Sequence, residues 1–119
     1  MNRALLFAFA ILLGCAQARA EPPPSPTEEQ ARIMDRIEAE VRMPRGALPL
    51  ADYGRYYAWK SENGVRKVVA VYVWEENGRR HWVAEDRLPA ILDGGCNVVN
   101  LRFDVAADEI ERVGCNGFA

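Results

Sequence analysis

The residues best suited to covalent or acid–base chemistry are few, because this chain of 119 residues has three cysteines and one histidine. Cys96 and Cys115 lie in the C-terminal region, and two cysteines in an oxidising compartment favour one disulfide. Such a bridge would close a loop of about 20 residues, which is worth on the order of 3 kcal/mol by chain-entropy arguments. We expect no metal site, because the sequence has no Cys-x-x-Cys motif and no second histidine.

His81 is the one histidine of the sequence and the candidate for general acid–base catalysis. Glu85 and Asp86 are acidic neighbours of His81 in the sequence, but no serine, cysteine or lysine stands in a recognisable nucleophile motif. We therefore predict no catalytic residue and no cofactor. An enzyme that uses His81 is the third of three hypotheses for the function.

The N-terminal segment predicts export. It begins with a short basic stretch, residues 4–13 are apolar, and Ala18 and Ala20 form the small-x-small pattern that precedes a signal-peptidase cut. We predict that residues 1–20 are a signal peptide and that the mature protein is periplasmic or secreted by a bacterium. The apolar run is shorter than the roughly 20 residues that span a bilayer, so we expect no transmembrane span in the mature chain.

Cys15 supports a second interpretation of the same segment. Leu12-Leu13-Gly14-Cys15 resembles a bacterial lipobox, the motif in which the cysteine is lipidated and becomes the first mature residue. The resemblance implies an outer-membrane lipoprotein with a lipid anchor on Cys15. Both cuts leave Cys96 and Cys115 to pair with each other.

The charge of the mature chain excludes some classes of partner. A cut after Ala20 leaves 13 basic and 17 acidic residues, a net charge of −4. Nucleic acids and anionic membrane surfaces attract basic proteins, so we expect a protein, peptide or glycan partner instead. The remaining 99 residues suffice for one domain. We predict a Pro-rich spacer at residues 21–26 and a single small α+β domain at residues 27–119.

An amphipathic helix is predicted to open this domain. Ser25 can serve as its N-cap and Pro26 can occupy the first helical position. Glu28 and Arg32 form an i,i+4 pair in the favourable order, and the helix is expected to end near Arg42. The apolar stripe has the helical spacing i, i+4, i+8 and consists of Ile33, Ile37 and Val41.

Five strand-like runs follow the helix, at residues 53–60, 66–74, 80–84, 97–105 and 109–115. Asn63-Gly64 and Asn77-Gly78 each predict a two-residue hairpin turn, because Asn and Gly tolerate positive φ angles. The sequence therefore predicts an α+β fold, with the helix packed on an antiparallel meander of four to five strands. This order of elements resembles that of cystatin-like folds, although no sequence motif accompanies it.

The two turns assign side chains to the faces of the predicted sheet. The first turn places Tyr57 opposite Ala70, and the second places Trp74 opposite His81. The face predicted to receive the helix carries Tyr56, Ala58, Val69, Val71, Val73, Trp82 and Ala84. The other face, called the aromatic face below, carries Arg55, Tyr57, Trp59, Tyr72, Trp74 and His81.

Two interpretations of the aromatic face follow. Its rings could stabilise the sheet across strands, half buried by the terminal hairpin, the Pro-rich segment or a second subunit. They could instead form a recognition surface, because Tyr, Trp and Arg dominate interaction hot spots. The leading hypothesis is a non-catalytic binding or interaction module of the bacterial cell envelope that acts through this face. The alternative is a lipid-anchored structural or assembly lipoprotein of the envelope.

Overall fold

The computed structural model describes residue 14 and residues 24–117. The rest of the predicted signal peptide, including Cys15, and the first three residues of the spacer lie outside the described residues. Residues 24–117 form one helix and a five-stranded sheet, so the predicted α+β class is confirmed. In this part of the chain no helix is long and apolar enough to cross a membrane.

Helix α1 (Glu28–Glu40) begins two residues later than the predicted cap implied. Thr27 is the N-cap, since its hydroxyl accepts a hydrogen bond from the Gln30 amide at 3.1 Å. The Gln30 side chain accepts in turn from the Thr27 amide at 3.0 Å, which completes a capping box. The predicted cap at Ser25 is wrong because this reciprocal pair satisfies the first orphan amides. Met34 and Ile37 are the fully buried residues of the helix.

The sheet has the strand order β3-β1-β2-β4-β5. Its strands are β1 (Tyr53–Glu62), β2 (Val65–Trp74), β3 (Arg80–Trp82), β4 (Val98–Asp104) and β5 (Glu109–Cys115). Short 3-10 turns, η1 (Leu50–Asp52), η2 (Glu85–Arg87) and η3 (Gly95–Asn97), lie in the connections. Asn63 and Gly64 adopt positive φ angles at the β1–β2 turn. The predicted register of this hairpin, with Tyr57 opposite Ala70, is confirmed.

The second predicted hairpin is wrong. Strand β3 does not return beside β2; it pairs in parallel with β1 at the edge of the sheet. Trp82 therefore lies opposite Tyr57, and Trp74 lies opposite Tyr53 rather than His81. The sheet is mostly antiparallel, with one parallel edge strand in place of a simple meander.

Gly78 explains how the chain reaches that edge. The β2–β3 connection crosses the start of β1, where the Glu75 amide donates to the Asp52 carbonyl at 3.0 Å. A Cβ atom at position 78 would lie 2.2 Å from the carbonyl carbon and oxygen of Tyr53. Asn77 adopts a φ of 55° beside it. The Asn-Gly pair thus marks a turn, but the turn carries the chain across β1.

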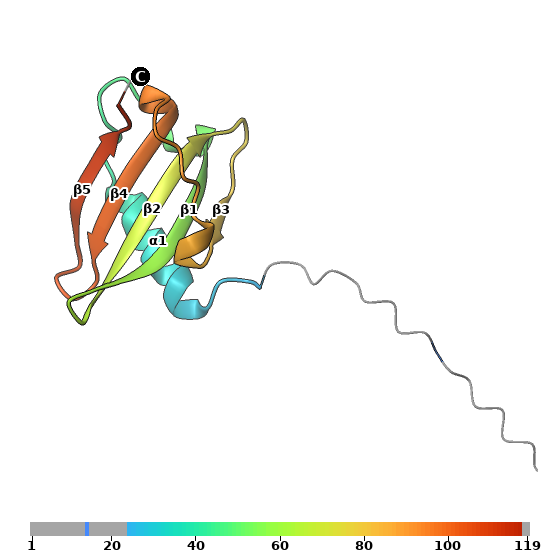
Figure 1. Ribbon diagram of the computed structural model, residues 1–119, viewed down its shortest axis with the longest axis vertical. Coiled ribbons are helices and arrows are strands. Elements are labelled where there is room, and N and C mark those ends of the chain that lie inside the picture. The colour runs from blue at the N-terminus through green and yellow to red at the C-terminus, as the bar shows by residue number, and fades with distance from the viewer. Residues whose placement is uncertain (1–13, 15–23, 118–119) are drawn as a thin grey trace, which may run out of the picture.

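Helix α1 covers the face opposite to the one predicted. In Figure 1 the helix lies behind the sheet, and the connection that contains η2 passes in front of it. Tyr57 and Tyr72 are fully buried in the core with Met34 and Ile37 of the helix. The prediction failed because it matched the helix to the more aliphatic face, whereas the larger rings of the aromatic face bury more surface. The core consists of Met34, Ile37, Tyr53, Tyr57, Val68, Ala70, Tyr72, Val99, Leu101 and Phe103.

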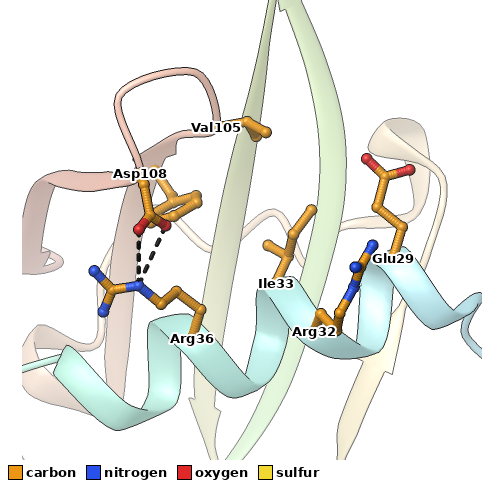
Figure 2. Close-up of a pocket in the computed structure, with 7 residues that line it drawn as sticks. Glu29, Arg32, Ile33, Arg36, Val105 and Asp108 are labelled. Atoms are coloured by element: carbon orange, nitrogen blue, oxygen red, sulfur yellow. Dashed lines mark hydrogen bonds and ion pairs between the residues drawn. The ribbon is translucent and has the colours of Figure 1, made fainter.

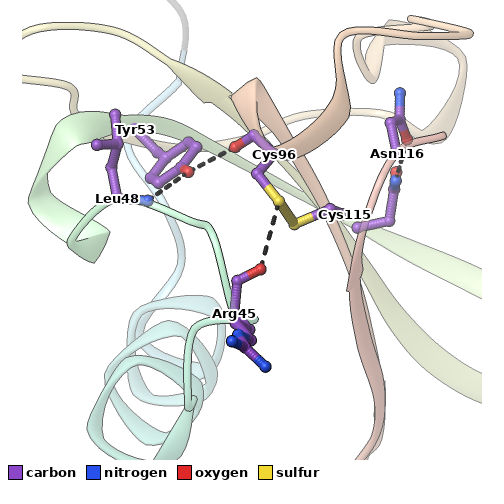
Figure 3. The surroundings of a disulfide bond; sticks show 7 residues. Arg45, Leu48, Tyr53, Cys96, Cys115 and Asn116 are labelled. Atoms are coloured by element: carbon purple, nitrogen blue, oxygen red, sulfur yellow. Dashed lines mark hydrogen bonds between the residues drawn. A yellow bond between two sulfur atoms is a disulfide. The ribbon is translucent and has the colours of Figure 1, made fainter. Parts of the chain in front are cut away.

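The predicted disulfide between Cys96 and Cys115 is confirmed. It joins η3 to the last residue of β5, with the two Cα atoms 4.6 Å apart. Beside it the buried Tyr53 hydroxyl donates to the Cys96 carbonyl at 2.6 Å and accepts from the Leu48 amide at 3.0 Å (Figure 3). We call this part of the molecule, where β2 and β5 end and β4 begins, the disulfide end.

We predict that Gly78→Ala lowers the free energy of unfolding by about 2 kcal/mol or more, because the added methyl group collides with the β1 backbone. Gly114→Ala is the matched control, since a Cβ atom there meets nothing within 4 Å. The control should change stability by about 0.5 kcal/mol at most. Urea denaturation of both variants measures the difference, and equal stabilities would contradict the crossing.

Candidate functional site

Three rings of the predicted aromatic face, those of Tyr57, Trp59 and Tyr72, belong to a row of packed rings beneath α1. Consecutive ring centroids are 5.0–6.5 Å apart. Trp82 belongs to this row, contrary to prediction, because its parallel pairing stacks it on Tyr57. Tyr57 and Tyr72 have no exposed surface, so they act as core residues in this structure. From the disulfide end the row runs Tyr53, Tyr72, Tyr57, Trp82 and Trp59.

A hydrogen bond links the two central tyrosines of the row. The hydroxyl oxygens of Tyr57 and Tyr72 lie 2.8 Å apart in the core. Burial, which disfavours the charged phenolate, raises the pKa of Tyr57 far above its ordinary value and also raises the pKa of Tyr72. Both side chains therefore stay neutral over the whole physiological range.

Arg55 was predicted to be part of a binding surface, but the structure places it between the helix and the sheet. Its Nε lies 2.5 Å from a carboxylate oxygen of Glu38, and both side chains are only 14% exposed. Its Nη1 donates to the carbonyls of Leu50, Tyr53 and Gly78 at 3.2–3.4 Å. Arg55 thus joins α1, η1, β1 and the crossing connection.

His81 lies on the face opposite α1, apart from the rest of the aromatic face. Its ring stacks on Tyr56 with the centroids 4.9 Å apart. Glu85, an acidic neighbour of His81 in the sequence, pairs with Lys60 at 3.2 Å. Within residues 24–117 no group of three or more His, Cys, Asp or Glu side chains could hold a metal ion.

The two remaining aromatic-face residues differ in exposure. Trp59 is half-buried, with the Arg66 guanidinium carbon 4.0 Å from the centre of its ring. Trp74 is the last residue of β2 and is 57% exposed. Of the six residues predicted for this face, Trp74 is the one that presents a large apolar surface to solvent.

Further exposed apolar side chains lie at the disulfide end, in the connections that precede η1 and η3. Of the five large hydrophobic residues that are exposed in the described part of the chain, four lie here. The fifth, Val65, lies at the opposite end of the sheet beside the β1–β2 turn. Leu92 is 97% exposed, more than any of the others. We call the set the apolar end; it consists of Leu48, Trp74, Ile91 and Leu92.

Ordered hydrogen bonds hold the backbone of the apolar end. The Asn116 side chain donates to the carbonyls of Ile91 and Asp93 at 2.7 and 3.0 Å. These bonds fix the loop that carries Leu92, although the Leu92 side chain is almost fully exposed. The Leu48 backbone is fixed in the same way by the hydroxyl of Tyr53. A weak signal for this loop is present in the sequence, where a short apolar run, Pro89 to Leu92, stands before Asp93-Gly94-Gly95.

Acidic and amide groups border the apolar end. Leu48 and Trp74 line a hollow of about 580 Å³ together with Asp52, Glu76 and Asn97. The hollow is open to solvent, and its rim carries two carboxylates. It can accommodate an apolar group from a partner and can attract a neighbouring positive charge.

Comparisons of the chain with protein-family models, curated proteins and solved structures gave no match.

We predict that Tyr57 and Tyr72 ionise only as the protein unfolds. Their native pKa values are raised, whereas tyrosine side chains in an unfolded chain have a pKa of about 10. Above that pH the unfolded state binds fewer protons than the native state, so stability falls as pH rises. An absorbance titration at alkaline pH should show late phenolate signals that coincide with loss of near-ultraviolet circular dichroism. Tyr57→Phe should remove part of the late signal, and phenolate formation by both residues in the folded protein would contradict the burial.

Proposed function

We propose that this protein is an exported, non-catalytic binding module of the bacterial cell envelope that contacts a partner protein through its apolar end. The observation that carries the proposal is the exposure of Trp74, at the end of β2 opposite Tyr53, and of Leu92, in the loop that Asn116 holds. Tryptophan is among the residues that dominate binding energy at protein interfaces.

The grouping of these residues supports an interface more than their number does. Single exposed apolar side chains are common on soluble proteins. Here Leu48 and Trp74 share one hollow, and Ile91 and Leu92 lie in the loop that Asn116 holds at the same end of the domain. Apolar surface that is grouped in this way is typical of interaction sites. The Leu92 side chain buries almost no surface when the domain folds. A partner that covers this side chain would therefore gain the free energy of burying it.

The charges around the apolar end indicate the chemistry of the partner. Asp52 and Glu76 border the hollow beside Trp74, and Asp93 follows Leu92 in the sequence. The mature chain after a cut at Ala20 has a net charge of −4. A partner with an apolar patch bordered by Lys or Arg would complement both features, and the opposite charges would speed association.

Export is supported by the predicted signal peptide and agrees with a disulfide, which persists in oxidising compartments. In Figure 1 the described chain enters the domain at the end of the sheet opposite the disulfide end. A lipid anchor on Cys15 would therefore tether the domain by the far end and leave the apolar end free. The proposed contact is compatible with cleavage after Ala20 and with cleavage before Cys15.

Site-specific photo-crosslinking in the producing cells tests this proposal. A photoreactive residue at position 74 or 92 should give a discrete crosslinked protein, whereas the same residue at position 65 should not. Val65 is the matched control, because it is 44% exposed but lies at the other end of the sheet. Equal products from all three positions, or none from positions 74 and 92, would contradict the proposal.

Affinity measurements with the crosslinked partner complete the test. Trp74→Ala should weaken binding by about tenfold or more, as expected for a central aromatic contact. Trp74 contributes little to the core, so the variant should keep the disulfide and the unfolding midpoint of the native protein. Val65→Ala should leave the affinity unchanged.

A further inference from the structure

We infer that a groove between α1 and the β4–β5 hairpin binds the anion of a single-chain fatty acid. Figure 2 shows this groove, with Ile33 pointing from the helix toward Val105. It has a volume of about 390 Å³, and its floor is formed by Ile33, Phe103 and Val105. Four charged side chains line its rim: Glu29, Arg32, Arg36 and Asp108.

One end of the groove is closed by a charged group with an excess of negative charge. The Nε of Arg36 binds both carboxylate oxygens of Asp108, at 3.1 and 3.2 Å, and links α1 to the hairpin (Figure 2). Arg36 also pairs with Glu40 at 2.5 Å. One guanidinium therefore balances two carboxylates, and an anionic headgroup would be repelled from this end.

The other end of the groove carries an arginine that has no ion pair among the described residues. Glu29 is already paired with Arg66 at 2.7 Å. Arg32 is exposed and forms no ion pair within residues 24–117, because the predicted pair with Glu28 does not form. A guanidinium presents donors in a planar fork that matches a carboxylate.

These features together define one class of ligand. An apolar chain can lie on the floor of Ile33, Phe103 and Val105, while a carboxylate at one end of the chain binds Arg32. A single unpaired guanidinium balances one negative charge, which favours a monocarboxylate. The groove lies beside the turn of the β4–β5 hairpin, away from the disulfide end, so this inference is independent of the proposed function.

Binding of decanoate to the mature protein, at concentrations below micelle formation, tests the inference. Methyl NMR signals of Ile33 and Val105 should shift, and decyltrimethylammonium, which has the opposite charge, should bind at least about tenfold more weakly. Arg32→Gln should weaken decanoate binding by about tenfold, the loss expected for a charged hydrogen-bonded contact. Arg112→Gln is the matched control: Arg112 is exposed on β5, has no ion pair among the described residues, and should leave binding unchanged.

A second variant tests the floor of the groove. Val105→Glu places a carboxylate beside the proposed acyl chain and should abolish binding, with the fold checked by the Cys96–Cys115 disulfide and the circular dichroism spectrum. Three results would each overturn the inference: no methyl shifts with decanoate, equal binding of the cationic amphiphile, or equal effects of Arg32→Gln and Arg112→Gln.

Discussion

The contact between Arg55 and Glu38 is the interaction on which the arrangement of this fold depends. It joins α1 to β1, and the same guanidinium donates hydrogen bonds to carbonyls of η1, β1 and the β2–β3 connection. Arg80 of β3 binds Glu38 at 3.0 Å and Asp35 at 2.5 Å, so α1 is also tied to the parallel edge strand. A charge this far from solvent is costly when its partner is missing, which disfavours packing of α1 on the other face.

The position of the helix decides which surfaces remain for function. With α1 on the aromatic face, Tyr57 and Tyr72 become core residues and the tryptophans of β1 and β3 pack against each other. Trp74, the last residue of β2, stays exposed in a hollow that it shares with Asn97, next to the disulfide. The Cys96–Cys115 bridge and Asn116 then fix the loop that presents Leu92.

Local sequence patterns predicted the local structure well. The Asn63-Gly64 turn set the register of β1 and β2, and the spacing of Cys96 and Cys115 predicted their pairing. The face covered by α1 and the path of β3 could not be predicted in this way. The first depends on a contact between Glu38 and Arg55, and the second on the close approach of Gly78 to β1. Neither contact produces a periodic pattern in the sequence. The position of Arg55 among the rings of the aromatic face does indicate that an acidic residue covers that face.

Hydroxyl-radical footprinting of the native protein, read residue by residue, tests most directly which face the helix covers. The structure predicts fast oxidation of Trp74 and strong protection of Tyr57 and Tyr72, with Tyr56 reacting at an intermediate rate. Reduction and unfolding should remove the protection. Oxidation of Tyr57 and Tyr72 as fast as Trp74, together with protection of Tyr56, would show that the helix lies on the other face and would contradict this account.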